Sequence, residues 1–135
     1  MDWMLMPLMR YADFNGRSQR MEYWMFTLFY MLVLVVLVGF AVLFGSPAGE
    51  PHTLAENYFL VVTGLFVLGT IVPSIAVTVR RLHDQDKSGW FYLISFVPYV
   101  GGIVIFIFMC LEGTVGPNRY GPDPKGGIGY HDVFA

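Results

Sequence analysis

The stretch Val79-Arg80-Arg81-Leu82-His83-Asp84-Gln85-Asp86-Lys87-Ser88-Gly89-Trp90 decides the fold, because it is a short charged loop between two long apolar segments. No Asp, Glu, Lys or Arg occurs in residues 57–79 or in residues 88–111, and a third block without these residues covers 23–49. Each block is longer than the ~20 residues that a helix needs to cross the hydrocarbon core of a bilayer. The pattern predicts an all-α, multi-pass membrane protein.

The composition agrees with this class. The chain has 135 residues, of which 56% are hydrophobic and 13% are charged, whereas soluble domains average roughly 45–50% and about 25%. A small domain buries a small share of its surface, so the excess of apolar residues cannot be hidden in a soluble core. We expect one integral membrane domain over residues 1–124 and a flexible tail over 125–135.

The apolar blocks predict three transmembrane helices, at about 23–44, 58–79 and 90–111. The third block contains the helix-breaking run Pro98-Tyr99-Val100-Gly101-Gly102, which leaves two alternatives: one kinked helix that crosses, or a re-entrant hairpin that returns to its own side. We prefer the crossing. Each half of a hairpin would span only ~12–14 Å, which would leave polar backbone near the middle of the membrane.

The segments outside the spans are predicted to be short or irregular. Met1–Phe14 is too short and too charged to cross, and we expect an interfacial segment in which Pro7 limits any helix. Asn15 or Ser18 is available to cap the helix that follows. The chain from Glu112 onward is rich in turn residues and is expected to be an irregular C-terminal tail.

The second span contains a proline and a stripe of hydroxyl groups. Pro73 removes the hydrogen bond to the carbonyl of Gly69, which predicts a kink. Thr63, Thr70 and Ser74 fall on one helical face, and we expect that face to point inward. Their hydroxyls either bind a neighbouring helix or bond back to their own helix, and the sequence leaves both alternatives open.

The distribution of basic residues predicts the orientation. Lys and Arg occur before the first span and in the 80–89 loop, but none occurs in the connector 45–56. Because cytoplasmic loops carry the excess of Lys and Arg, the N-terminus and the 80–89 loop are expected in the cytoplasm. Three crossings would then place the tail, with Arg119 and Lys125, on the periplasmic or external side.

Five patches together resemble one family. They are Tyr11–Arg17 (YADFNGR), Arg20–Trp24 (RMEYW), Pro73–Asp84 (PSIAVTVRRLHD), Ser88–Trp90 (SGW) and Gly116–Gly121 (GPNRYG). The chain is identified from them as a member of the domain-of-unknown-function 805 family of small bacterial inner-membrane proteins, over about residues 3–124. The family usually has Ser at the position of Asn15, and either residue can cap a helix. The resemblance implies a bacterial plasma membrane location and brings no catalytic residues.

The chain contains little that predicts catalysis. His83 and Asp84 form a polar pair in the charged loop, and Asn118 and Arg119 form a polar motif in the tail. No nucleophile stands at a spacing typical of a catalytic triad, and His52 and His131 lie on other segments, so we predict no enzyme, no metal and no cofactor. Asp84 is expected to cap or pair within its loop, while neighbouring arginines complement the helix C-terminus.

Basic and aromatic residues share the predicted cytoplasmic face, where positive charge favours anionic lipid. The candidates for binding a phosphate headgroup are Arg17, Arg20, Arg80, Arg81 and Lys87, beside Trp24 and Trp90. We therefore expect a non-enzymatic component that binds membrane lipid, including anionic phospholipid, or forms a homo-oligomer or binds another membrane protein. The alternative is a subunit of a small oligomeric channel or transporter, although the spans hold no ionisable pathway residue. Nucleic acid is not expected, because no basic surface stands free of the membrane.

Overall fold

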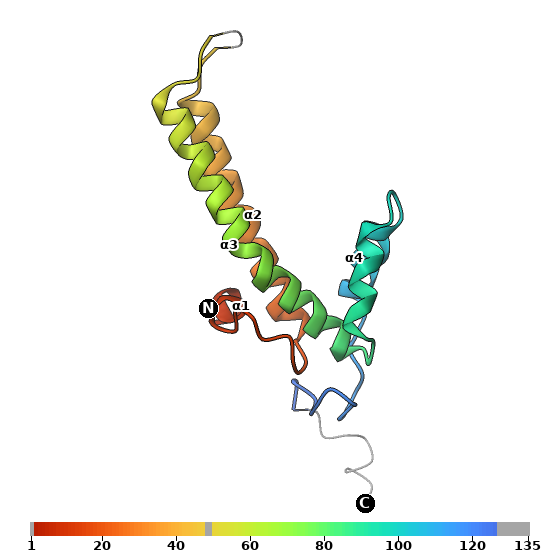
Figure 1. Ribbon diagram of the computed structural model, residues 1–135. Helices are drawn as coiled ribbons and strands as arrows, with labels where there is room; N and C mark the ends of the chain where they lie inside the picture. Colours follow the sequence, from red (N-terminus) through yellow and green to blue (C-terminus); the bar gives the residue numbers. More distant parts are fainter. Residues whose placement is uncertain (1, 48–49, 127–135) are drawn as a thin grey trace, which may run out of the picture.

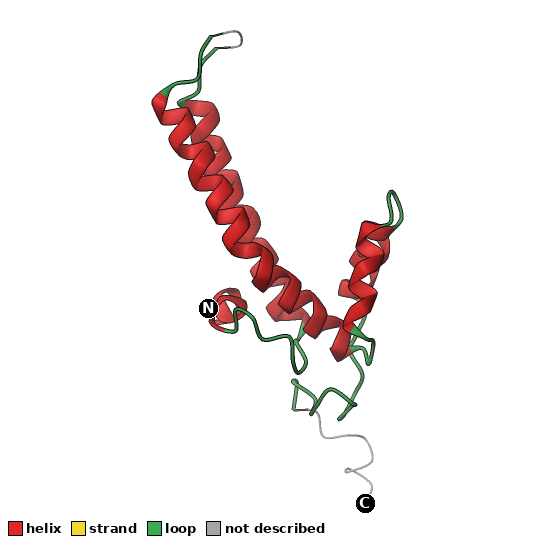
Figure 2. Cartoon of the chain, in the orientation of Figure 1, coloured by secondary structure: helices red, strands yellow, loops and turns green. Residues whose placement is uncertain are grey.

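The computed structural model describes residues 2–47 and 50–126, and within these ranges the chain is helical with no strand (Figure 1, Figure 2). The elements in chain order are α1 (Asp2–Met9), α2 (Arg20–Leu43), α3 (Leu54–Asp84), the 3-10 helix η1 (Gly89–Phe96) and α4 (Gly101–Cys110). The predicted all-α class is confirmed.

Helices α2 and α3 lie side by side as a long antiparallel hairpin (Figure 1). Only 11% of the most apolar segment of α2 and 22% of that of α3 are buried, whereas the core helix of a soluble protein would be largely covered. Two of the three predicted spans are therefore present as apolar helices of crossing length. With 31 residues, α3 is ~46 Å long and exceeds the ~30 Å hydrocarbon core, so part of it extends beyond the apolar layer.

The short helix α1 packs across α2 and α3, with the Pro7 side chain fully buried. Just after α1, the hydroxyl of Tyr11 donates a hydrogen bond of 2.7 Å to the carbonyl of Gly69 in α3. This is the carbonyl that Pro73 cannot reach, because proline has no backbone N–H. Tyr11 thus supplies the donor that the helix itself lacks, and it attaches the N-terminal segment to α3.

The hydroxyl stripe of α3 bonds back to its own helix. Thr63 donates to the carbonyl of Phe59 and Thr70 to the carbonyl of Phe66, both at 2.7 Å. Thr70 is buried, so this part of the face points inward as expected. Of the two alternatives for the hydroxyls of Thr63 and Thr70, the structure has the bond within the helix.

The third apolar block is not one crossing helix, and in this respect the structure differs from the preferred prediction. η1 and α4 pack against each other as a short hairpin that turns at residues 97–100 (Figure 1). Tyr99 adopts the left-handed conformation, with a φ of 68°. A Cβ on Gly101 would lie 2.0 Å from the carbonyl oxygen of Ile94, so glycine is needed where the two arms meet. The run of breaking residues therefore reverses the chain instead of kinking a single helix.

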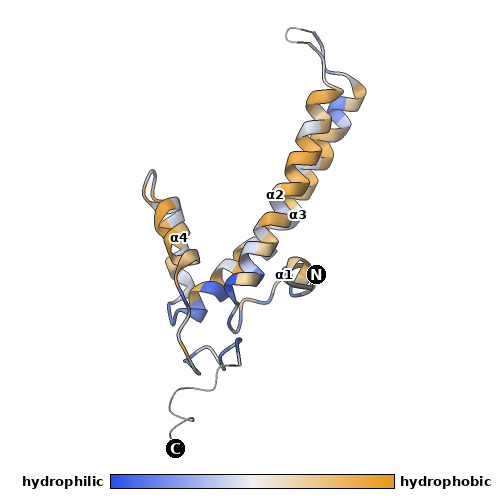
Figure 3. Ribbon diagram, turned by 180° about the vertical axis from the view of Figure 1, so that it is seen from behind, coloured by the Kyte–Doolittle hydropathy of each residue, from blue (hydrophilic) through white to orange (hydrophobic). Residues whose placement is uncertain are grey.

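The tail returns to the C-terminal end of α3, which includes residues 80–84 of the predicted charged loop, so that this part of the loop is helical. The N–H of Thr114 donates to the carbonyl of Asp84 at 2.8 Å, and an isolated bridge joins Asn118 to Gly121. Figure 3 shows hydrophilic residues gathered at this end and hydrophobic residues along the helices. A third crossing would have placed the tail and the 80–89 segment on opposite sides of the membrane. The two are instead in contact, because the hairpin of η1 and α4 returns the chain to the end of α3. Of the predicted flexible tail over 125–135, residues 127–135 lie outside the described residues.

Candidate functional site

Four segments meet at the C-terminal end of α3: the loop before α2, the first turn of α2, the last turns of α3 and the tail. They bury five charged side chains, none more than about 6% exposed. We call these residues the charged cluster: Arg17, Glu22, Arg80, Arg81 and Asp84. Burying charge is unfavourable unless the charges are paired and hydrogen-bonded, so the pairing within the cluster determines whether this end of the fold is stable.

Asp84 is the centre of the charged cluster. Its carboxylate accepts a hydrogen bond of 2.9 Å from Nε of Arg17 and pairs on its other oxygen with Arg81, one turn earlier in α3. The tail packs directly on it, since a Cβ on Gly113 would lie 1.9 Å from its Oδ2. Asp84 thus neutralises two buried arginines, and a glycine is required where the tail passes over it.

The two arginines also bind the tail backbone. Arg17 donates from Nη1 to the carbonyl of Gly116 at 2.6 Å and from Nη2 to the carbonyl of Thr114. Arg81 donates to the carbonyl of Leu111. The guanidinium groups therefore fasten the irregular tail to α3, and they use donors that a headgroup phosphate would otherwise take.

Glu22 and Arg80 form the second half of the cluster. Nη2 of Arg80 lies 3.0 Å from the Glu22 carboxylate, which also accepts a hydrogen bond from the hydroxyl of Ser18. Ser18 does not cap α2 as expected: the N-cap is Gln19, which makes no side-chain capping bond. Within the described residues the guanidinium nitrogens of Arg80 have no hydrogen-bond partner. Three arginines face two carboxylates here, so the cluster carries an excess positive charge.

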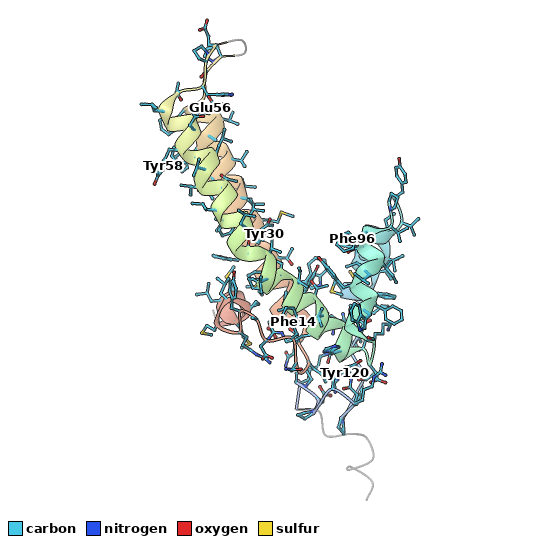
Figure 4. All side chains as sticks on the ribbon, in the orientation of Figure 1. Phe14, Tyr30, Glu56, Tyr58, Phe96 and Tyr120 are labelled. Atoms are coloured by element: carbon cyan, nitrogen blue, oxygen red, sulfur yellow. The ribbon has the colours of Figure 1, made fainter. Side chains whose placement is uncertain are left out.

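The predicted polar pair His83 and Asp84 does not interact. His83 stacks on Tyr120 with ring centroids 3.9 Å apart, and its Nδ1 lies 3.2 Å from the carbonyl of Gly16. The hydroxyl of Ser88 accepts a bond from the N–H of Trp90. Figure 4 places Tyr120 at the lower end of the fold, by the last turns of α3. His83 therefore serves as a contact between α3, the first loop and the tail.

In the structure the tail motif contacts the last turn of α3 and the loop that follows it. The Asn118 amide donates to the carbonyl of His83 at 2.9 Å, and Arg119 pairs with Asp86 at 3.1 Å. Further along, the N–H groups of Lys125 and Gly116 bind the Asp123 carboxylate, and the bond from Lys125 contributes most to lowering the pKa of that carboxyl. The tail up to Lys125 is thus an ordered part of the site.

The remaining lipid candidates lie around the cluster. Arg20 and Trp24 line a cavity of about 380 Å³ together with Glu112 and Lys125. The ammonium of Lys87 lies 5.1 Å from the centre of the Phe108 ring, and Trp90, which is 78% exposed, lines a second cavity on α3. The structure therefore divides the predicted set: Arg17, Arg80 and Arg81 are enclosed by protein, and the others border open space.

Sequence reasoning missed Glu22, Ser18 and the glycines of the tail as parts of this site. The sequence did contain one signal for Glu22: it is a carboxylate at the edge of an apolar span, and a buried charge there needs a partner of opposite charge. Within residues 2–47 and 50–126 no three His, Cys, Asp or Glu side chains gather as a metal site.

Known proteins are similar in sequence to this chain over most of its length. Residues 11–122 match the family described as "Protein of unknown function (DUF805)". The inner membrane protein YhaI of Escherichia coli strain K12 is 42% identical over 127 residues, which cover 94% of this chain and 98% of that protein. The inner membrane protein YhaH of the same strain is 40% identical over 125 residues, covering 93% and 98%. No solved structure matches the chain.

Proposed function

The chain belongs to the DUF805 family, and we propose that it binds anionic phospholipid without catalysing a reaction. It is an integral inner-membrane protein, in agreement with the names of its relatives and with its two apolar helices of crossing length. The observation that carries the proposal is the cavity of about 380 Å³ in which Arg20 and Lys125 stand beside Trp24.

The proposed orientation has two crossings, by α2 and α3, and a hairpin of η1 and α4 that enters the membrane and returns. All eight Lys and Arg residues then lie at one end of the molecule, and residues 45–56 at the other end carry only Glu50, His52 and Glu56 as ionisable groups. Because basic residues remain on the cytoplasmic side, both the N-terminal segment and the described part of the tail are cytoplasmic in this proposal.

The headgroup cavity lined by Arg20 and Lys125 has the charge that a phosphate requires. Nη2 of Arg20 lies 2.8 Å from the Glu112 carboxylate, and Nζ of Lys125 lies 3.9 Å from the same carboxylate oxygen. Two cations therefore face one carboxylate. Glu112 is 71% exposed, so it can turn into water when a phosphate takes its place. Nε of Arg20 is buried without a hydrogen-bond partner among the described residues.

The enclosed arginines have a different part in this proposal. Arg17 and Arg81 hold the tail against α3, and the tail carries Glu112 and Lys125 to the headgroup cavity. Trp24 makes edge-to-face contact with Phe106 of α4, with ring centroids 5.7 Å apart. The charged cluster thus holds in place the tail segment that completes the cavity, and none of its own residues lines the cavity.

The test is retention of phosphatidylglycerol by the purified protein, measured by native mass spectrometry from micelles that also contain phosphatidylethanolamine. A basic residue near anionic lipid contributes ~1 kcal/mol, so Arg20→Gln and Lys125→Gln should each reduce retention about fivefold. Arg119→Gln is the matched control, because it removes the same charge from a residue paired with Asp86 outside the cavity. Equal losses of lipid retention in all three variants would mean that net charge, and not the cavity, determines retention. The same spectra report the oligomeric state, which distinguishes this function from an oligomeric channel or transporter subunit.

A further inference from the structure

A second cavity, of about 490 Å³, lies between α3 and η1 and shares no residue with the headgroup cavity. Its volume is within the ~300–1,000 Å³ of small-molecule sites. We call it the His83 cleft. The residues that the argument uses are Ile75, Val79, His83, Ser88, Trp90 and Tyr120.

The wall of the His83 cleft is apolar and continues along α3. Ile75, Val79 and Leu93 line it together with Phe14, which Figure 4 places beside the lower part of α3. A smaller cavity of about 250 Å³ shares Ile75 and Tyr92 with it and reaches Val67. From His83 to Val67 the helix rises ~24 Å. This elongated path is lined by apolar side chains together with Thr70 and Ser74, and it accommodates one extended hydrocarbon chain.

One end of the His83 cleft carries polar groups with free hydrogen-bonding capacity. The Gly16 carbonyl can only accept, so the bond at Nδ1 of His83 places the ring proton there and leaves Nε2 as an acceptor. A Cβ on Gly89 would lie 3.4 Å from Nε2, so this nitrogen stands beside the cleft wall where a side chain is absent. The Ser88 hydroxyl accepts from the Trp90 N–H and retains its own proton to donate.

The charge around this polar end favours an uncharged ligand. Among the residues that the structure describes, no Lys, Arg, Asp or Glu lines the His83 cleft. The guanidinium of Arg119 stacks on Tyr120 and is neutralised by Asp86 at 3.1 Å. A carboxylate or phosphate would lose its hydration here without gaining a cation, which is strongly unfavourable. A hydroxyl group can both donate and accept, which matches the groups present.

We propose that the His83 cleft binds an amphiphile with a single long hydrocarbon chain and an uncharged, hydroxyl-bearing head, of the chemical class of monoacylglycerols and long-chain alcohols. The hydroxyl donates to Nε2 of His83 and accepts from the hydroxyl of Ser88. The chain follows Val79 and Ile75 along α3. This inference does not depend on the headgroup cavity, and either site can be absent while the other is present.

The test uses Trp90, which lines the His83 cleft, as a fluorescent reporter. In a Trp3→Phe/Trp24→Phe variant it is the one remaining tryptophan of the three. The probe is 1-palmitoylglycerol with bromine on its chain, a quencher, added to detergent micelles. Quenching by this probe is expected to saturate. The methyl ester of the same brominated chain has no hydroxyl to donate. It should therefore reach half-saturation at a concentration about two- to tenfold higher, which is the effect of one hydrogen bond.

Substitutions locate the site. His83→Asn keeps a donor for the Gly16 carbonyl but removes Nε2, and it should weaken monoglyceride quenching about two- to tenfold while leaving the methyl ester unaffected. Ile75→Phe should abolish saturation, and Val36→Phe, at an exposed position on α2, is its control. In protein without substitutions in the cleft, half-saturation at equal concentrations of the two probes overturns the proposed recognition of the hydroxyl head. Non-saturating quenching, unchanged by Ile75→Phe, overturns the site itself.

Discussion

The isosteric substitution Asp84→Asn is expected to be strongly destabilising. The carboxylate of Asp84 is the common partner of Arg17 and Arg81, and all three side chains are at most 4% exposed. Asparagine retains the shape but removes the charge, so two guanidinium groups stay buried without a counter-ion. Breaking a buried pair from one side costs ~3–5 kcal/mol. The expected shift in the unfolding equilibrium is therefore about two to more than three orders of magnitude.

The assay is reversible unfolding in mixed micelles of a mild detergent and dodecyl sulfate, followed by circular dichroism. The matched control is Asp86→Asn, two residues away, whose pair with Arg119 is exposed on both sides; such pairs contribute ~0–1 kcal/mol. In a cycle with Arg17→Gln, the double variant should be less destabilised than the sum of the single variants, by ~0.5–3 kcal/mol. Similar losses for Asp84→Asn and Asp86→Asn, with additive effects in the cycle, would refute the assignment of Asp84 as the centre of the cluster.

Three further predictions follow from particular contacts. Tyr11→Phe should lower the free energy of unfolding by ~0.5–1.5 kcal/mol. The loss should be small in a Pro73→Ala background, because the N–H of residue 73 can then donate to the Gly69 carbonyl. An equal loss in both backgrounds contradicts the pairing of Tyr11 with that carbonyl. Gly101→Ala should disrupt the hairpin, because the new Cβ meets the Ile94 carbonyl at 2.0 Å, whereas Gly102→Ala, with no atom within 4 Å, should be neutral or gain up to ~1 kcal/mol. With Cys110→Ser as background, a cysteine at Arg119 should react with an impermeant maleimide only after the inner membrane is opened, and one at Glu50 should react in intact cells; labelling of both in intact cells contradicts the proposed orientation.

The third apolar block shows where sequence reasoning reached its limit. Length and composition predicted that residues 90–111 enter the membrane, but a crossing helix and a returning hairpin satisfy both criteria equally. The outcome depends on the left-handed conformation of Tyr99 and on the packing of Gly101 against Ile94. These are contacts between two arms, and no periodicity or hydropathy reports them. The breaker run gave the correct position of the turn and left its geometry open.

The arginines show a second limit. Counting Lys and Arg gives the same result whether a side chain faces a lipid headgroup or a buried carboxylate, so Arg17, Arg80 and Arg81 were predicted to be lipid contacts. Their partners come from distant segments: Asp84 is 67 residues from Arg17 and Gly116 is 99 residues from it. Pro73 likewise indicated that the Gly69 carbonyl was free, but its donor, Tyr11, lies 58 residues away. Long-range pairing of this kind needs the fold.

The separation of Arg17 from Gly116 also fixes the order in which the protein can be completed during synthesis. The chain leaves the ribosome from its N-terminus, and 99 residues separate the two partners, or ~5–20 s of translation. In the proposed orientation, Arg17 lacks its tail partners while α2 and α3 insert, so its positive charge is free to retain the N-terminal segment on the cytoplasmic side. Once the tail arrives, the same guanidinium becomes an internal fastener. In that orientation, one arginine acts first during membrane insertion and later as a contact of the folded structure.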